Sequence, residues 1–198
     1  MQKENRRVRI TKLLLNESFL RLLSKKPLAR FTVKEICADA DLNRSTYYQY
    51  YTDPYDQMTK LEEDIIEEMT SYVDTIKDEP VLDYSQLYQV IKKMLDYMHA
   101  KREMFRVLLN NNGDISIQKD ILTVFSEKFL PPDFKTSKDK TELLQDFIFV
   151  SNGSFGIIFY WLMIDNAEST ADLAKRITDF VEDFLQSRKK RIVERGNA

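Results

Sequence analysis

The fold is decided by residues 31–54, which read FTVKEICADADLNRSTYYQYYTDP. Two short helical patterns lie in this stretch, separated by a break at Asp41. Thr32 and Glu35 have the spacing of a capping box, in which each side chain binds the backbone N–H of the other residue, so they open the first helix. The second pattern covers about residues 44–50. The stretch therefore predicts two short helices joined by a tight turn.

Further helical patterns flank this pair. Residues 9–25 carry apolar side chains at helical spacing, and Pro27 ends that helix because proline cannot continue one. Asn43 is expected to cap the second short helix. Asp53 followed by Pro54 has the form of an N-cap with proline at the first helical position, so a fourth, long helix should begin there.

The composition favours helices throughout. Of the 198 residues, 43% are hydrophobic, which is enough to bury a core, and only 4 are Gly and 5 are Pro. A sheet-rich fold needs turn residues every 8–12 residues or so, and this chain does not supply them. With one cysteine and one histidine, the chain lacks the residues for an internal disulfide or for a metal site built from several cysteines or imidazoles. We expect an all-α protein without cofactor or metal.

Downstream of the short helices, the patterns predict helices at 54–77, 83–100, 101–111, 115–130, 138–165 and 170–192. We therefore expect about nine helices in two domains, an N-terminal three-helix bundle over residues 1–53 and a C-terminal helical domain over residues 54–198. The most apolar stretch, residues 147–164, is interrupted by polar residues and glycines. Because a membrane span needs about 20 clean apolar residues, we interpret the stretch as a buried interface helix of a soluble protein.

The charge is distributed unevenly along the chain. Residues 1–53 carry 11 basic and 6 acidic residues, a net +5, whereas the rest of the chain carries a net −7. A basic end on an acidic body is typical of a protein that binds a polyanion at one end only. A chance imbalance on a solvated surface remains the alternative at this point.

The side chains of the second short helix divide into two faces. Tyr47 and Tyr51 are four residues apart and are expected to face the core. The outward face then carries Arg44, Ser45, Tyr48 and Gln49. Arginine pairs with guanine and glutamine with adenine, while hydroxyls reach phosphate oxygens. The two helices are thus typical of a helix-turn-helix, whose second helix enters the major groove of DNA.

Residues outside that helix extend the candidate DNA-binding set. Thr32 begins a helix whose N-terminal N–H groups favour a phosphate, and arginines before the first helix are placed to reach the backbone or the minor groove. The full set is Arg6, Arg7, Thr32, Arg44, Ser45, Thr46, Tyr48, Gln49 and Tyr50.

Residues 31–51 resemble the DNA-binding segment of TetR-family transcriptional regulators, and the match extends over about residues 8–68. The glycine usual at the turn is Asp41 here, and aspartate tolerates a left-handed backbone better than most residues. The phosphate-binding lysine common after Asp53 is Pro54 here, so Lys60 or the N-terminal arginines would have to replace that contact. Residues 153–162 are similar to the penultimate helix of a Firmicutes-like branch of the family.

The resemblance implies that the C-terminal domain binds an effector and forms a homodimer. Met and aromatic residues line adaptable apolar cavities, so the candidate lining of a pocket for a small apolar or aromatic ligand is Met69, Tyr72, Met94, Met98, Phe105, Phe125 and Phe159. Two helices that are apolar on more than one face must be covered on both sides, and the candidate dimer interface is Gly153, Gly156, Trp161, Ile177, Phe180 and Phe184. A core role alone, within a monomer, remains open for both sets.

The leading hypothesis is a cytoplasmic, nucleoid-associated, dimeric and ligand-responsive repressor that binds a palindromic operator in double-stranded DNA. The alternative is a TetR-like helical coactivator or interaction module that acts mainly through protein partners. Pro54 and the low net charge of the whole chain favour it slightly. An enzyme is not expected, because a nucleophile with a nearby base and a Gly-rich phosphate loop are both missing.

Overall fold

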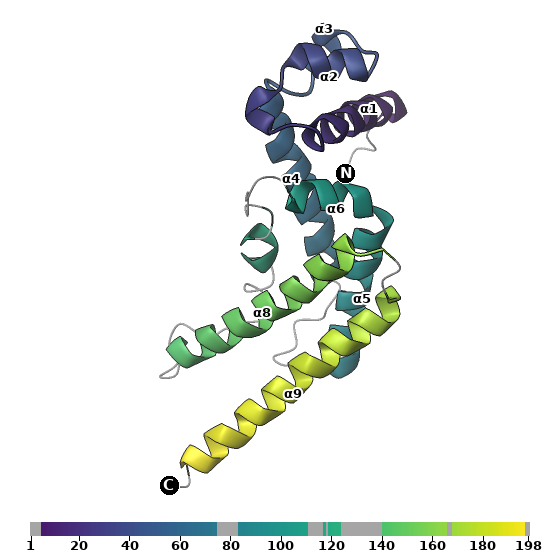
Figure 1. Cartoon of the computed structure of the whole chain (residues 1–198). Coiled ribbons are helices and arrows are strands. Elements are labelled where there is room, and N and C mark those ends of the chain that lie inside the picture. Colours follow the sequence, from purple (N-terminus) through teal and green to yellow (C-terminus); the bar gives the residue numbers. More distant parts are fainter. Residues whose placement is uncertain are drawn as a thin grey trace. The chain divides into compact units, whose positions relative to one another are not determined.

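The computed structural model describes residues 5–74, 83–110, 117, 119–123, 140–165 and 168–196. Every regular element within these residues is a helix (Figure 1), which confirms the all-α prediction. The chain divides into two compact units. Unit 1 comprises Met1–Glu67 and Glu103–Ile117, and unit 2 comprises Glu68–Arg102 and Gln118–Ala198.

Unit 1 contains the helices predicted around the deciding stretch. Its elements are α1 (Arg6–Leu23), the short 3₁₀ helix η1 (Leu28–Arg30), α2 (Val33–Asp39), α3 (Arg44–Tyr47), the first part of α4 (Pro54–Val73) and nearly all of α6 (Arg102–Leu109). The first helix begins earlier than expected because Asn5 caps it, its side-chain oxygen accepting from the N–H of Arg7 at 3.1 Å.

The core of unit 1 joins α1 to α2. Phe19 is completely buried, and its ring meets that of Phe31 edge to face with 5.3 Å between centroids. The buried Ser18 hydroxyl donates to the carbonyl oxygen of Ile36 at 2.9 Å, which satisfies both groups inside the core. Cys37 is buried beside them, and burial raises the pKa of its thiol. This cysteine is the small core residue that its place on the apolar stripe predicts.

The division between the units falls inside α4, after Glu67, whereas the sequence predicted a boundary at residue 53. The first turns of α4 are attached to unit 1 by side chains. Gln57 is fully buried and donates to Asn16 of α1 at 3.0 Å, and Lys60 donates to the carbonyl oxygen of Tyr50 at 2.9 Å. These contacts explain why the start of the long helix belongs with the short ones.

Unit 2 is built on three long helices, α5 (Tyr84–Ala100), α8 (Lys140–Met163) and α9 (Thr170–Gly196). α5 and α9 pack side by side (Figure 1), and the Tyr84 hydroxyl joins them by donating to Asp179 at 2.5 Å. The end of α8 is held by Arg102, which donates to the carbonyl oxygens of Leu162 at 3.0 Å and Trp161 at 2.8 Å. These carbonyls are among the last ones of a helix, which have no partner within the helix itself.

α8 is apolar yet largely uncovered. The helix Thr141–Met163 is long and apolar enough to cross a membrane by length and composition, but core helices of soluble proteins pass the same test. Only 11% of its most apolar stretch is buried inside the chain. Phe149 is 71% exposed and Tyr160 is 66% exposed. Contacts within the described residues therefore leave most of this helix, which was predicted to be buried, uncovered.

Candidate nucleic-acid interface

The first helix of the helix-turn-helix opens with the predicted capping box. The N–H of Glu35 donates to the Thr32 hydroxyl at 3.3 Å, and the N–H of Thr32 donates to the Glu35 carboxylate at 3.1 Å. Lys26 donates to the same carboxylate at 2.6 Å, and this contact is the main reason that the pKa of Glu35 is lowered. The Glu35 carboxylate thus already occupies the start of α2. A phosphate bound there would have to share the N–H groups with it.

The turn between α2 and α3 has a left-handed residue where the sequence predicts one. Asp41 has a φ of 53°, and the N–H of Leu42 donates to the carbonyl oxygen of Cys37 at 2.9 Å. Asn43 has the extended backbone of an N-cap, but its side chain makes no capping hydrogen bond, so that part of the prediction is wrong. The turn is held by backbone bonds instead.

α3 separates its two faces as expected but is shorter than predicted. Tyr47 is fully buried and Tyr51 is 4% exposed, whereas Tyr48 is 58% exposed. The α-helix ends at Tyr47 because the next N–H groups, those of Gln49 and Tyr50, bond three residues back and not four. The chain therefore continues to residue 51 as a tightened turn.

The candidate DNA-binding residues lie mainly on the surface of unit 1. Those that are exposed are Arg6, Arg7, Thr32, Arg44, Ser45, Tyr48 and Gln49, and those that are half-buried are Thr46 and Tyr50. The arginines lie inside the first turn of α1 and not before it. Four of the exposed residues come from α3 and its turn, which brings them to one edge of the unit.

Asn16 forms a junction that the sequence did not reveal. Its side-chain oxygen accepts from the Tyr51 hydroxyl at 3.2 Å and from Gln57 at 3.0 Å. One α1 side chain therefore bonds to the end of the recognition turn (residues 48–51, which follow α3) and to the start of α4. No sequence pattern marks this role, because the three residues are 35 and 41 positions apart along the chain.

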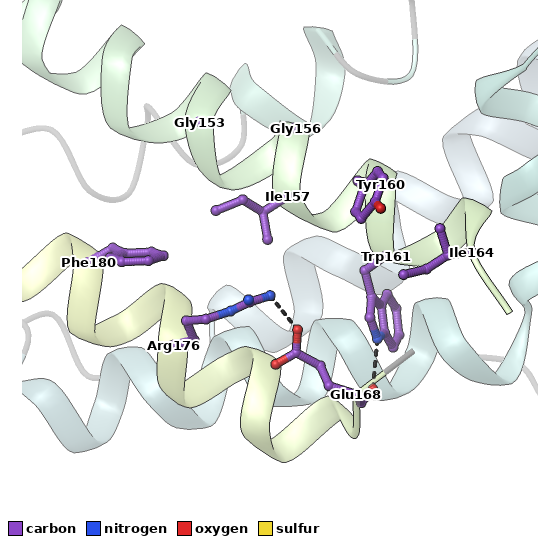
Figure 2. A pocket seen from close by; sticks show the side chains of 9 residues that line it. All are labelled: Gly153, Gly156, Ile157, Tyr160, Trp161, Ile164, Glu168, Arg176 and Phe180. Atoms are coloured by element: carbon purple, nitrogen blue, oxygen red, sulfur yellow. Dashed lines mark hydrogen bonds and ion pairs between the residues drawn. The ribbon is translucent and has the colours of Figure 1, made fainter. Parts of the chain in front are cut away.

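A second candidate surface lies in unit 2, where α8 and α9 border a pocket of about 560 Å³ (Figure 2). It is lined by Gly153, Gly156, Ile157, Tyr160, Trp161, Ile164, Glu168, Arg176 and Phe180. Arg176 forms an ion pair with Glu168, and the indole N–H of Trp161 donates to the carbonyl oxygen of Glu168 at 2.8 Å. A Cβ atom added at either glycine would meet nothing within 4 Å, so the α8 backbone is open there.

Four of the six residues predicted for a dimer interface, Gly153, Gly156, Trp161 and Phe180, line this pocket. Phe180 is 55% exposed, but Trp161 and Ile177 are each 2% exposed and therefore support the surface from beneath. Phe184 is half-buried and stacks on Phe149 at 5.9 Å between centroids.

The residues predicted to line an effector cavity are found elsewhere. None of the described ones lines the pocket between α8 and α9. Met69, Met94, Met98 and Phe105 are buried, Tyr72 and Phe159 are half-buried, and Phe125 lies outside the described residues. The Tyr72 hydroxyl donates to Glu68 at 2.5 Å, and the pKa of Tyr72 is raised to about 12 by burial and this bond. Their role in binding a ligand stays a prediction.

A capped α2, a left-handed turn and a short α3 with a polar outer face define a protein of the helix-turn-helix class. Comparison with known proteins specifies the class further. Residues 85–183, half of the chain, match the TetR-type family model described as the transcriptional regulator C-terminal region. The chain belongs to the TetR family of transcriptional regulators.

Individual relatives agree with this assignment. The chain is 25% identical over 172 residues to an uncharacterized HTH-type transcriptional regulator, YxbF, of Bacillus subtilis, which covers 84% of the chain but 43% of that relative. The chain thus spans less than half the length of this curated relative.

Two solved structures share the fold. A TetR regulator of Streptococcus agalactiae aligns with a TM-score of 0.62 at 16% identity, over 89% of this chain and 96% of that one. One of Streptomyces coelicolor aligns with a TM-score of 0.69 at 12% identity, over 96% of this chain and 86% of that one. These relatives are transcriptional regulators, which is a class of proteins other than enzymes.

Proposed function

We propose that this chain is a cytoplasmic, dimeric repressor that reads a palindromic operator with α3 and its following turn. The observation that carries the proposal is the sorting of the tyrosines, since Tyr47 and Tyr51 fill the core and leave the polar edge outside. That edge presents Arg44 and Gln49, side chains that pair with guanine and adenine in the major groove. TetR-family regulators bind DNA and dimerise, which supports the same assignment.

The charges on α1 support contact with a polyanion. Arg6 and Arg7 lie in the first turn of α1, which contains no acidic residue. Positive charges at a helix N-terminus oppose the helix dipole and cost a few tenths of a kcal/mol each. A phosphate bound near them would remove that cost, so their place is better suited to a DNA-bound state than to a free one.

The uncovered side of α8 supports dimerisation. Phe149, Tyr160 and Phe180 are all more than half exposed, and the open backbone at Gly153 and Gly156 permits close approach of another helix. We propose that a second copy covers α8 and α9 around a twofold axis. The same surface patch then serves both partners, as an isologous interface requires, and two recognition helices about 34–36 Å apart meet successive major grooves.

DNA binding is tested with the full chain on duplexes that it selects from a random-sequence pool. We expect a preferred sequence with twofold symmetry and a linear fall of log K with log salt. Arg44→Ala and Gln49→Ala should each cost about 1–3 kcal/mol and relax the preference at one base pair of each half-site. Lys93→Ala, an exposed position on α5, is the control and should leave binding unchanged.

The outcomes separate the two functions. If both variants bind the selected duplex as the wild type does, α3 is not the reading element. If no sequence is enriched and no salt dependence is seen, the alternative of a coactivator that acts through protein partners is favoured.

Dimerisation is tested with a matched pair of substitutions. Phe180 and Leu13 are each 55% exposed, but Phe180 borders the α8–α9 pocket and Leu13 lies on α1 of unit 1. Phe180→Glu should shift the chain to the monomer in analytical ultracentrifugation, and Leu13→Glu should not. Equal behaviour of the two variants would refute the proposed interface.

A further inference from the structure

Lys60 of α4 contacts the end of the recognition turn. Its ammonium group donates to the carbonyl oxygen of Tyr50 at 2.9 Å and to the carboxylate of Asp56 at 3.0 Å, and it lies 5.7 Å from the ring centroid of Tyr51. The side chain is 45% exposed, so about half of its surface is covered. The sequence had suggested a different role for this lysine, as a phosphate ligand that replaces the one lost at Pro54.

Asp56 connects the same turn a second time. Its carboxylate accepts from the N–H of Thr52 at 2.8 Å as well as from Lys60. These two bonds, the Thr52 bond first, lower the pKa of Asp56, so the carboxylate stays charged to a lower pH than an ordinary aspartate does. Asp53 completes the attachment by accepting from the N–H groups of Tyr55 and Asp56 at 2.8 and 2.9 Å. Together Lys60 and Asp56 form a clamp on residues 50–52.

The recognition element, which is α3 together with the recognition turn, depends on contacts such as those of Lys60 and Asp56 because it is short. α3 contains four residues, and the N–H groups of Gln49 and Tyr50 that follow it bond three residues back. Isolated helices shorter than about 12–15 residues are marginal in water, so the direction of Tyr48 and Gln49 is set by what holds the turn from outside. The carbonyl oxygen of Tyr50 lies at the end of that turn, where a cation is favourable.

We propose that Lys60 is a positioning residue for DNA recognition, which holds residues 48–51 against α4 so that the reading side chains keep one orientation, and that it does not act by neutralising a phosphate. The inference rests on the proposed DNA-binding function. It assigns the clamp formed with Asp56 a part in sequence specificity.

The first test needs no DNA. Hydrogen exchange in the free full-length chain should become faster at residues 50–52 in both Lys60→Met and Asp56→Asn. The α2 amides around Glu35 serve as an internal control and should not change, since their cap involves neither residue. Unchanged exchange at residues 50–52 in the two variants would overturn the clamp itself, whatever the chain binds.

The second test measures DNA binding to a duplex selected by the wild-type chain and to a duplex of random sequence. We expect Lys60→Met to bind the selected duplex about tenfold more weakly, with little change on the random duplex and an unchanged salt slope. Lys60→Arg should restore part of the loss. Arg7→Met, which removes a proposed phosphate contact, is the comparison and should reduce the salt slope by about 1.

Asp56→Asn distinguishes positioning from charge. It removes a negative charge from the DNA-binding unit, so a purely electrostatic role predicts tighter binding to both duplexes, whereas the clamp predicts weaker binding to the selected one. A salt slope reduced by about 1 in Lys60→Met, with equal losses on both duplexes, would show a phosphate ligand and overturn the proposal. If the wild type selects no duplex, the proposed function fails, and the exchange result alone then decides on the clamp.

Discussion

The two buried tyrosines that end the recognition element should respond in opposite ways to the loss of one oxygen atom. Tyr47 is fully buried, and within the described part of the chain its hydroxyl has no hydrogen-bond partner. Tyr51 is almost as buried, but its hydroxyl donates to Asn16 at 3.2 Å. We predict that Tyr47→Phe stabilises the chain and that Tyr51→Phe destabilises it.

The magnitudes follow from the two environments. A buried polar group without a partner costs about 1–3 kcal/mol, while a hydrogen bond contributes about 0.5–1.5 kcal/mol net. Phenylalanine keeps the ring contacts of both residues, including the 5.5 Å approach of their two centroids. We therefore expect a gain of about 1 kcal/mol for Tyr47→Phe, a loss of about 1 kcal/mol for Tyr51→Phe, and a difference of about 2 kcal/mol between them.

The assay is urea unfolding of the full chain at one fixed protein concentration, because association would otherwise contribute to the apparent stability. Helical circular dichroism gives the midpoint, and hydrogen exchange of residues 31–53 shows whether unit 1 carries the change. Trp161 is the sole tryptophan and belongs to unit 2, so its fluorescence reports on the other unit. A Tyr47→Phe variant that loses as much stability as Tyr51→Phe would refute the account of the two hydroxyls.

Three further predictions concern stability. Asp41→Val should cost about 1–2 kcal/mol in urea unfolding, because a β-branched residue is strained at a φ of 53°. Asp41→Gly should leave the free energy of unfolding unchanged or raise it. Equal losses in the two variants would contradict the assignment of a left-handed turn. Arg102→Lys should lower the unfolding midpoint followed by Trp161 fluorescence by the equivalent of about 2 kcal/mol, because the ammonium group of lysine cannot replace the planar guanidinium that bonds several α8 carbonyls at once. An unchanged midpoint would show that Arg102 does not hold the end of α8. The pKa of Glu35 is lowered by Lys26 and that of Asp39 by Arg21. The stability that these carboxylates give is therefore present above their ordinary pKa of about 4 and is lost as pH falls through the folded values. Asp39→Asn should flatten the acid side of a plot of urea midpoint against pH, and a slope identical to that of the wild type would contradict this prediction.

Local backbone chemistry made much of unit 1 predictable from the sequence. The capping box at Thr32, the N-cap at Asp53 and the left-handed turn at Asp41 each depend on residues at most five positions apart. The shared face of Tyr47 and Tyr51, both of which are buried, follows from their spacing of four residues. Short-range rules of this kind need no knowledge of the tertiary fold.

Contacts between distant residues were not predictable in the same way. Asn16 bonds to Tyr51 and Gln57, and Lys60 bonds to the backbone of the recognition turn and not outward. The early end of α3 was not predictable either, because the sequence does not state that the N–H groups of Gln49 and Tyr50 bond three residues back. The shape of the pocket between α8 and α9 was not predictable either. Its walls come from two helices, and the sequence does not state the distance between them.

The recognition element is thus gripped from two sides. Asn16 of α1 binds Tyr51, and the pair of Lys60 and Asp56 on α4 binds the neighbouring backbone. Because Gln57 of α4 bonds to the same Asn16 oxygen, α1, the turn and the start of α4 cannot shift against one another without breaking partly buried hydrogen bonds.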